Sequence, residues 1–180
     1  HDVGMTCGGE VELLFEAFFP KSWKVVVFGA GHIAQELVEI LSRLELSLVC
    51  VDTRTEWLER LKKSEKLKAV CVESYESYVS QASADCFFVI VTQGHATDLQ
   101  VAEKVFQTFP SAPYVGVIGS QIKAKKIRNE LMQKLPNEDF LERLHCPMGV
   151  FKGKNHPGEI AISICAELIQ VRDRLETISP

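Results

Sequence analysis

Short apolar runs alternate along the chain with longer segments in which apolar residues recur at helical spacing. The short runs are rich in β-branched and aromatic residues and end at glycine or at polar residues, as buried parallel strands do. They predict strands over 24–28, 46–51, 68–72, 86–91 and 113–117. The longer segments predict helices over 32–44, 55–63, 96–108, 121–134 and 157–174, with a short helix over 75–80. This alternation predicts an α/β fold, a Rossmann-like parallel sheet with helices on both faces.

The N-terminal residues do not follow this alternation. Residues 11–19 are apolar with two interposed glutamates and predict an extended lead-in strand. We therefore divide the chain into a lead-in, 1–20, expected to be the tail of an upstream region, and a Rossmann-like domain, 21–180. A chain of 180 residues is long enough for one domain with its own hydrophobic core.

Composition and charge argue against several classes of function. The net charge of −4 argues against nucleic-acid binding, which needs a basic surface. No apolar run approaches the ~20 residues of a membrane-spanning helix, and the N-terminus lacks a signal peptide's basic and apolar regions. No C-x-x-C pair occurs, and Cys50, Cys71, Cys86 and Cys165 lie in or beside apolar patterns. We therefore expect a cytoplasmic protein with buried, reduced thiols and with neither a membrane nor a nucleic-acid partner.

The first predicted strand of the domain leads into the most informative motif, Gly29-Ala30-Gly31-His32. Gly29 permits a tight turn, and Gly31 lets a ligand approach the backbone without meeting a Cβ atom. Ala34 takes the place of a third glycine, where a small residue allows close packing of helix and strand. The helix that follows begins with free N–H groups and a positive dipole end, which attract an anion. The motif therefore predicts a site for a nucleotide-like or phosphate-bearing ligand.

A carboxylate and a guanidinium follow the second predicted strand. Asp52 lies about 20 residues after the glycines, where an acid can accept hydrogen bonds from ribose hydroxyls. Asp52 could also cap the next helix or pair with Arg54. Both residues are candidates for ligand contact.

Each of two histidines follows a glycine at the same predicted edge of the sheet, His32 after Gly31 and His95 after Gly94. Either imidazole could hydrogen-bond a phosphate or an oxo group, or could simply face solvent in a turn. Asp98 lies one helical turn past His95 and could orient it or act as a cap.

A second glycine-rich turn, with Gly119 and Ser120, follows the last predicted strand. Ser120 is well placed as a helix N-cap, and this interpretation is favoured over ligand contact. The chain shows no nucleophile–base pair and no pair of carboxylates at a useful spacing, so no catalytic residue is predicted.

Taken in order, the motifs of the chain are Cys7-Gly-Gly-Glu10, Phe28-Gly-Ala-Gly-His32, Asp52-Thr-Arg54, Gly94-His95 with Asp98, Tyr114-Val-Gly-Val-Ile-Gly-Ser120 with Lys123, and Pro147-Met-Gly149 followed by Pro157, Glu159-Ile-Ala161, Ser163 and Ala166-Glu167. In this order they resemble the xanthine dehydrogenase accessory protein family, of the XdhC/CoxI type. The resemblance covers the chain from Met5 to about Arg172. It implies a molybdenum-cofactor chaperone that binds the pterin-based cofactor, shelters it while a cysteine desulfurase sulfurates it, and passes it to xanthine dehydrogenase or a related molybdenum hydroxylase. We also expect a homodimer.

The resemblance directs attention to one set of cofactor-binding candidates: Gly29, Ala30, Gly31, His32, Asp52, Arg54, Gly94, His95, Gly119 and Ser120. Cys7, in a polar segment, is a candidate metal ligand, because a thiolate is a soft ligand for molybdenum and an acceptor for sulfur. The alternative is a small residue at a packed turn. The chain departs from the family at Val150-Phe151, where Leu-Asp or Leu-Asn is common, and it starts too late to hold the family's upstream region.

A second hypothesis uses the same glycine turn for a different function, as an NAD(P)-dependent oxidoreductase or a nucleotide-binding regulatory domain. Asp52 supports this hypothesis, and Arg54 is compatible with a phosphate-bearing nucleotide. Against it, the chain has no separate substrate domain, and His32 and His95 are its only obvious proton donors.

Overall fold

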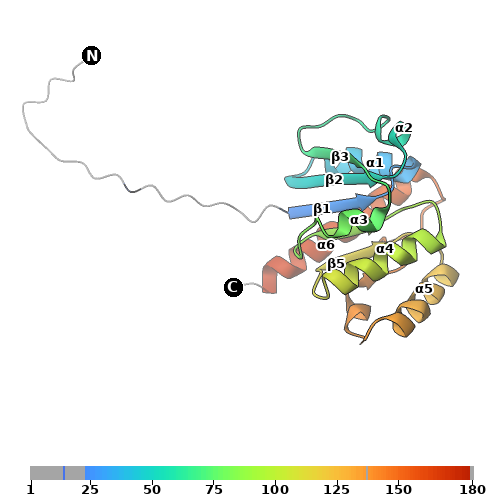
Figure 1. Cartoon of the computed structure of the whole chain (residues 1–180). Coiled ribbons are helices and arrows are strands. Elements are labelled where there is room, and N and C mark those ends of the chain that lie inside the picture. Colours follow the sequence, from blue (N-terminus) through green and yellow to red (C-terminus); the bar gives the residue numbers. More distant parts are fainter. Residues whose placement is uncertain (1–13, 15–22, 137, 179–180) are drawn as a thin grey trace, which may run out of the picture.

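The structure is a computed structural model that describes residue 14 and residues 23–136 and 138–178 (Figure 1). Its strands are β1 (Trp23–Phe28), β2 (Leu46–Asp52), β3 (Leu67–Cys71), β4 (Phe87–Ile90), β5 (Tyr114–Val117) and β6 (Leu144–His145). They form one parallel sheet in the order β3-β2-β1-β4-β5-β6. The predicted Rossmann-like fold is thereby confirmed. The predicted lead-in strand over 11–19 lies, apart from Leu14, outside the described residues.

The helices are α1 (His32–Leu41), α2 (Thr55–Leu58), α3 (Tyr75–Val79), α4 (His95–Thr108), α5 (Gln121–Lys134) and α6 (Pro157–Ile178), with a 3₁₀ helix, η1 (Asp139–Glu142). Each predicted helix is present, although some end elsewhere. The helix predicted over 55–63 stops at Leu58, and the chain then turns so that Leu61 is buried against the core. The helix α1 ends at Leu41, where the Ser42 hydroxyl donates to the Val38 carbonyl at 2.7 Å.

Alternate side chains of the central strands enter two separate hydrophobic cores, one on each face of the sheet. Val26 and Phe28 pack with residues of α3, α4 and α5. Val25 and Val27 pack with residues of α1 and α6. These two helices cover the other face of the sheet (Figure 1). Because both faces are covered, the strands read as continuous apolar runs in the sequence.

The last helix, α6, is apolar along much of its length and packs against α1. Ala161, Ile164 and Leu168 are fully buried, whereas Ile162 is more than half exposed. Within the described part of the chain, no helix is both long enough and apolar enough to cross a membrane.

The strand order places a topological switch point between β1 and β4. The chain leaves β1 toward α1 on one face of the sheet and leaves β4 toward α4 on the other. The loops after these two strands therefore separate at the carboxyl edge of the sheet, which is where open α/β sheets bind their ligands.

Candidate functional site

The glycine loop after β1 combines one closely packed position with one open position. Gly29 has φ +106°, and a Cβ atom there would lie 2.4 Å from the Val91 carbonyl oxygen. Its N–H donates to the Val51 carbonyl at 2.7 Å, which fixes the loop onto β2. A Cβ atom on Gly31 would meet no described atom within 4 Å. The loop is therefore fixed at Gly29 and open in front of Gly31.

The start of α1 beside this open space is not capped by any described side chain. Gly31 is the N-cap. All residues in the first turn of α1 belong to the described part of the chain, and none of them is acidic. Gly94 is likewise the N-cap of α4, without a side-chain hydrogen bond and with open space where its Cβ would lie. Two glycine-capped helix starts thus flank the switch point. Because the first turn of α4 already contains Asp98, the free N–H groups at the start of α1 are the ones that favour an added anion.

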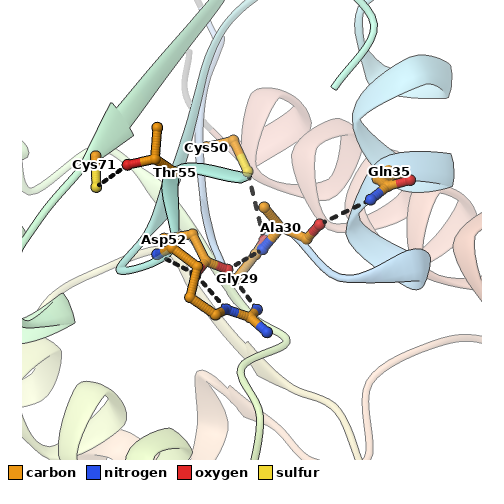
Figure 2. Close-up of polar contacts among 8 residues, drawn as sticks. Gly29, Ala30, Gln35, Cys50, Asp52, Thr55 and Cys71 are labelled. Atoms are coloured by element: carbon orange, nitrogen blue, oxygen red, sulfur yellow. Dashed lines mark hydrogen bonds and ion pairs between the residues drawn. The ribbon is translucent and has the colours of Figure 1, made fainter. Parts of the chain in front are cut away.

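The Asp52 carboxylate holds the glycine loop and Arg54 together. Figure 2 shows Asp52 beside Ala30 of this loop. It is fully buried; Oδ2 accepts from the Ala30 N–H at 2.7 Å and from Arg54 Nη2 at 2.9 Å. Oδ1 accepts from Arg54 Nε at 2.9 Å and from the Arg54 N–H at 3.0 Å. Burial alone would raise the pKa of Asp52, but the hydrogen bonds from Arg54 and Ala30 outweigh it and lower that pKa. Of the three roles considered from sequence, the structure shows the pair with Arg54; direct ligand contact by Asp52 stays a prediction.

Arg54 connects the carboxyl ends of β2 and β4. With the Gln93 amide oriented so that its oxygen faces the guanidinium, that oxygen accepts from Arg54 Nε at 2.8 Å. The guanidinium also lies 4.9 Å from the centre of the Trp57 ring. Its side chain is 29% exposed, so a positioned cation remains accessible at the switch point.

His32 lies beside the same tryptophan. Its ring is edge-on to Trp57 with 5.1 Å between the ring centres, and the Arg60 guanidinium lies over the Trp57 ring, 4.6 Å from its centre. Sequence reasoning missed Trp57, although its place between Arg54 and Arg60, three residues from each, was the available signal. The aromatic ring keeps cationic and ionisable side chains next to the start of α1.

His95 and Asp98 have partners other than each other. His95 Nε2 lies 3.3 Å from Glu130 on α5. The buried Asp98 carboxylate accepts from the Thr92 N–H at 3.1 Å and pairs with Lys123. Among the described residues Asp98 therefore fixes the loop after β4 and does not orient His95, whose ligand role stays a prediction.

Gly119 and Ser120 follow β5, which is separated by β4 from β1 and its glycine loop. The Ser120 hydroxyl accepts from the Lys123 N–H at 3.3 Å, so Ser120 is the N-cap of α5 as favoured from sequence. Both residues line a separate cleft of about 1040 Å³ bounded by the start of α5, residues 144–155 and α6. A ligand role for either residue stays a prediction.

Glu167 on α6 is the polar centre of that cleft's inner wall. Its carboxylate accepts from the Tyr114 hydroxyl at 2.7 Å and from the Gly149 N–H at 2.8 Å, and it lies 3.1 Å from His145 Nδ1. Burial alone would raise the pKa of Glu167, but the hydrogen bonds from His145, Gly149 and Tyr114 outweigh it and lower that pKa. Glu167 stands out in the sequence as a polar exception on an apolar helix. His145 does not, because the strand β6 that positions it has only two residues.

The prediction of buried cysteines is confirmed for three thiols and wrong for one. Cys50, Cys86 and Cys165 are buried and free, as expected. The expectation for Cys71 is wrong: this thiol is exposed, because β3 is an edge strand, and it lies 3.3 Å from the Thr55 hydroxyl (Figure 2). Cys7 lies outside the described residues. Among the residues that the structure describes, no group of three or more His, Cys, Asp or Glu side chains could hold a metal ion.

The hydrogen bonds of Asp52 predict how the free energy of unfolding depends on pH. The folded-state pKa of Asp52 lies below the ordinary value of 3.8. The stabilisation of the fold by the ionised carboxylate is therefore complete at pH values above 3.8, and it is lost as the pH falls through the folded-state pKa. We expect Asp52→Asn to lower the free energy of unfolding at neutral pH by about 2 kcal/mol. This difference should shrink at pH values below 3.8. Urea unfolding of both proteins across this range measures it; a difference that stays constant with pH would show that the charge of Asp52 is not involved.

Comparison with known proteins decides the family. The model of the XdhC Rossmann domain matches residues 25–168. The chain belongs to the XdhC Rossmann domain family. This match spans the sheet from β1 to β6 and about half of α6, so it includes both the glycine loop and the cleft.

Three known proteins illustrate how the domain relates to longer chains. YqeB of Escherichia coli K12 is 27% identical over 173 residues, which is 95% of this chain and 31% of YqeB. A probable xanthine dehydrogenase subunit of Bacillus subtilis 168 is 26% identical over 157 residues, 86% of this chain and 44% of that protein. The crystal structure of a xanthine dehydrogenase from Bacillus halodurans superposes with a TM-score of 0.71 at 24% identity, covering 88% of this chain and 47% of that one, and shows the shared fold. The chain thus spans less than half the length of each of these proteins.

Proposed function

We propose that this domain binds the molybdenum cofactor, protects it during sulfuration and delivers it to xanthine dehydrogenase or a related molybdenum hydroxylase. The observation that carries the proposal is the uncapped start of α1 at Gly31, open to solvent beside the fixed guanidinium of Arg54. Backbone N–H groups and a positioned arginine suit a phosphate group. The pterin-based cofactor carries a phosphate.

The architecture of the site favours binding over catalysis. Asp52, Asp98 and Glu130 each pair with a cation or an imidazole at this edge of the sheet, so each carboxylate has a positioning contact. Binding and release need no chemical step in this chain. The accessory role is therefore to hold the cofactor as cargo, with sulfur supplied by a cysteine desulfurase.

Family membership supports the proposed class of the enzyme that receives the cofactor. The chain belongs to the XdhC family, and the similar protein of Bacillus subtilis is named as part of a probable xanthine dehydrogenase. We infer that the apoenzyme that receives the cofactor is of this class. We further propose that the protein acts as a homodimer with two-fold symmetry, the commonest arrangement of soluble oligomers.

The test is direct binding of the cargo. The chain is mixed anaerobically with purified molybdenum cofactor, passed through gel filtration, and the protein peak is oxidised and assayed for pterin fluorescence. We expect pterin to co-elute at about one per chain, as for one cofactor bound at the glycine loop. If no pterin co-elutes while NADH or NADPH raises the melting temperature, the function is nucleotide binding instead, because a ligand specific for the folded state must stabilise it.

A further inference from the structure

The cleft at the other half of the carboxyl edge is a separate feature of the molecule. Its described lining comes from the start of α5, from β6, from residues 146–155 and from α6. None of Gly29–His32, Asp52, Arg54 or His95 lines it. A ligand in this cleft would therefore contact different residues from a phosphate at the glycine loop.

The loop that forms the outer wall of the cleft is held firmly to α6. The buried Ser163 hydroxyl donates to the Phe151 carbonyl at 2.7 Å and accepts from the Phe151 N–H at 3.0 Å. Gly149 has φ +107°, donates to Glu167, and has no room for a Cβ atom, which would lie 2.7 Å from the Ser163 hydroxyl. The Met148 N–H donates to the Val117 carbonyl at 3.2 Å. The cleft is therefore formed before any ligand arrives, which lowers the entropic cost of binding.

This fixed loop presents apolar side chains to solvent. Val150 is 48% exposed and Phe151 is 51% exposed, and Ile122 at the start of α5 is 84% exposed. All three line the cleft. Polar anchors on α6 thus keep an aromatic ring at the surface, where it offers an apolar face to a planar ligand.

The charged groups of the cleft favour an anion. Arg128 and Lys152 line it, and Arg128 is positioned by a hydrogen bond from Nη2 to the Cys146 carbonyl at 3.2 Å. The negative charge of Glu167, which also lines the cleft, is already met by three donors. The imidazole of His145 is held by Glu167 and stacked on Tyr114, with 4.3 Å between ring centres. It adds an oriented hydrogen-bonding edge at the inner wall.

We propose that this cleft is a second ligand site that takes a planar heterocycle bearing an anionic group. The ring packs against Phe151, the anionic group pairs with Arg128 and Lys152, and His145 hydrogen-bonds the heterocycle. The site stands independently of the function proposed for the glycine loop. A cleft of about 1040 Å³ is large enough for a ligand of two or three fused rings.

Pterin-6-carboxylate is a suitable probe, because it is planar, fluorescent and stable in air and carries a carboxylate but no phosphate. Binding is measured by fluorescence anisotropy. We expect Arg128→Gln and Lys152→Gln each to raise the dissociation constant about tenfold, as the loss of a charge-assisted contact predicts. Phe151→Ser should raise it about fivefold through the loss of ring packing. Pterin without the carboxylate should bind more weakly to the wild-type protein and equally to wild-type and Lys152→Gln proteins.

Gly31→Asp is the control, since it alters the glycine loop and not the cleft, and it should bind the probe as the wild-type protein does. Melting temperatures of all variants identify any that fail to fold, and the exposed Lys152 provides a substitution with no buried contact. The proposal is overturned if the wild-type protein does not bind the probe, or if binding is lost in Gly31→Asp and kept in the cleft variants. Either result leaves the binding of molybdenum cofactor at the glycine loop to be decided by the gel-filtration experiment.

Discussion

Gly31→Asp should abolish binding of the molybdenum cofactor while the domain stays folded. A Cβ atom at Gly31 meets open space, and the backbone there has φ −67°, which any residue adopts. An aspartate can therefore be accommodated at the N-cap of α1, a position that this side chain favours. Its carboxylate would cap the N–H groups and place a negative charge where the phosphate is proposed to bind. We expect cofactor affinity to fall by at least about a hundredfold, the effect of losing two charge-assisted hydrogen bonds.

The measurement is the pterin content of the protein peak after anaerobic gel filtration, with the melting temperature as the check on folding. Two controls separate charge from position. Gly31→Ala adds a methyl group without charge and should weaken binding less. Ser111→Asp adds the same charge at an exposed position before β5, on the opposite edge of the sheet, and should change nothing. Undiminished pterin in the Gly31→Asp peak would contradict the assignment of the glycine loop.

The sheet could be predicted from sequence because its determinants are local. Strands buried on both faces appear as apolar runs, and the glycines after β1 mark a turn whose positive φ at Gly29 favours glycine. Such alternation predicts a parallel sheet and leaves few possible strand orders, and the structure shows which of them the chain adopts. The short strand β6 escaped prediction because two residues carry no periodicity, and its pairing with β5 depends on a loop that follows η1.

The polar residues that follow the strands can be recognised in the sequence, but most of their contacts cannot. Asp52 and Arg54 are recognisable at a strand end, yet their mutual pairing and the contact with Ala30 depend on how β2 and the glycine loop meet in space. Glu167 stands out as a polar residue on an apolar helix, but its three donors come from β5, β6 and the loop after β6. Contacts between elements so distant in sequence leave no local pattern.

The second large effect concerns stability, and it tests whether the glycine loop depends on Gly29. We expect Gly29→Ala to lower the free energy of unfolding by about 3 kcal/mol, from backbone strain and a steric clash together. The backbone has φ +106°, and the new methyl group would lie 2.4 Å from the Val91 carbonyl oxygen. Because that oxygen belongs to the backbone after β4, relief requires the loops after β1 and β4 to move apart.

The comparison that isolates this effect is Gly31→Ala, two residues away in the same loop. Its backbone is unstrained and its methyl group meets open space, so the loss should be at most about 1 kcal/mol, the cost of alanine at an N-cap. Urea unfolding of the two variants and the wild-type protein gives both differences under one set of conditions. Equal losses in the two variants would mean that the approach of Gly29 to Val91 does not fix the loop. A much larger loss for Gly29→Ala would show that the close approach of Gly29 to the Val91 carbonyl contributes to the stability of the fold.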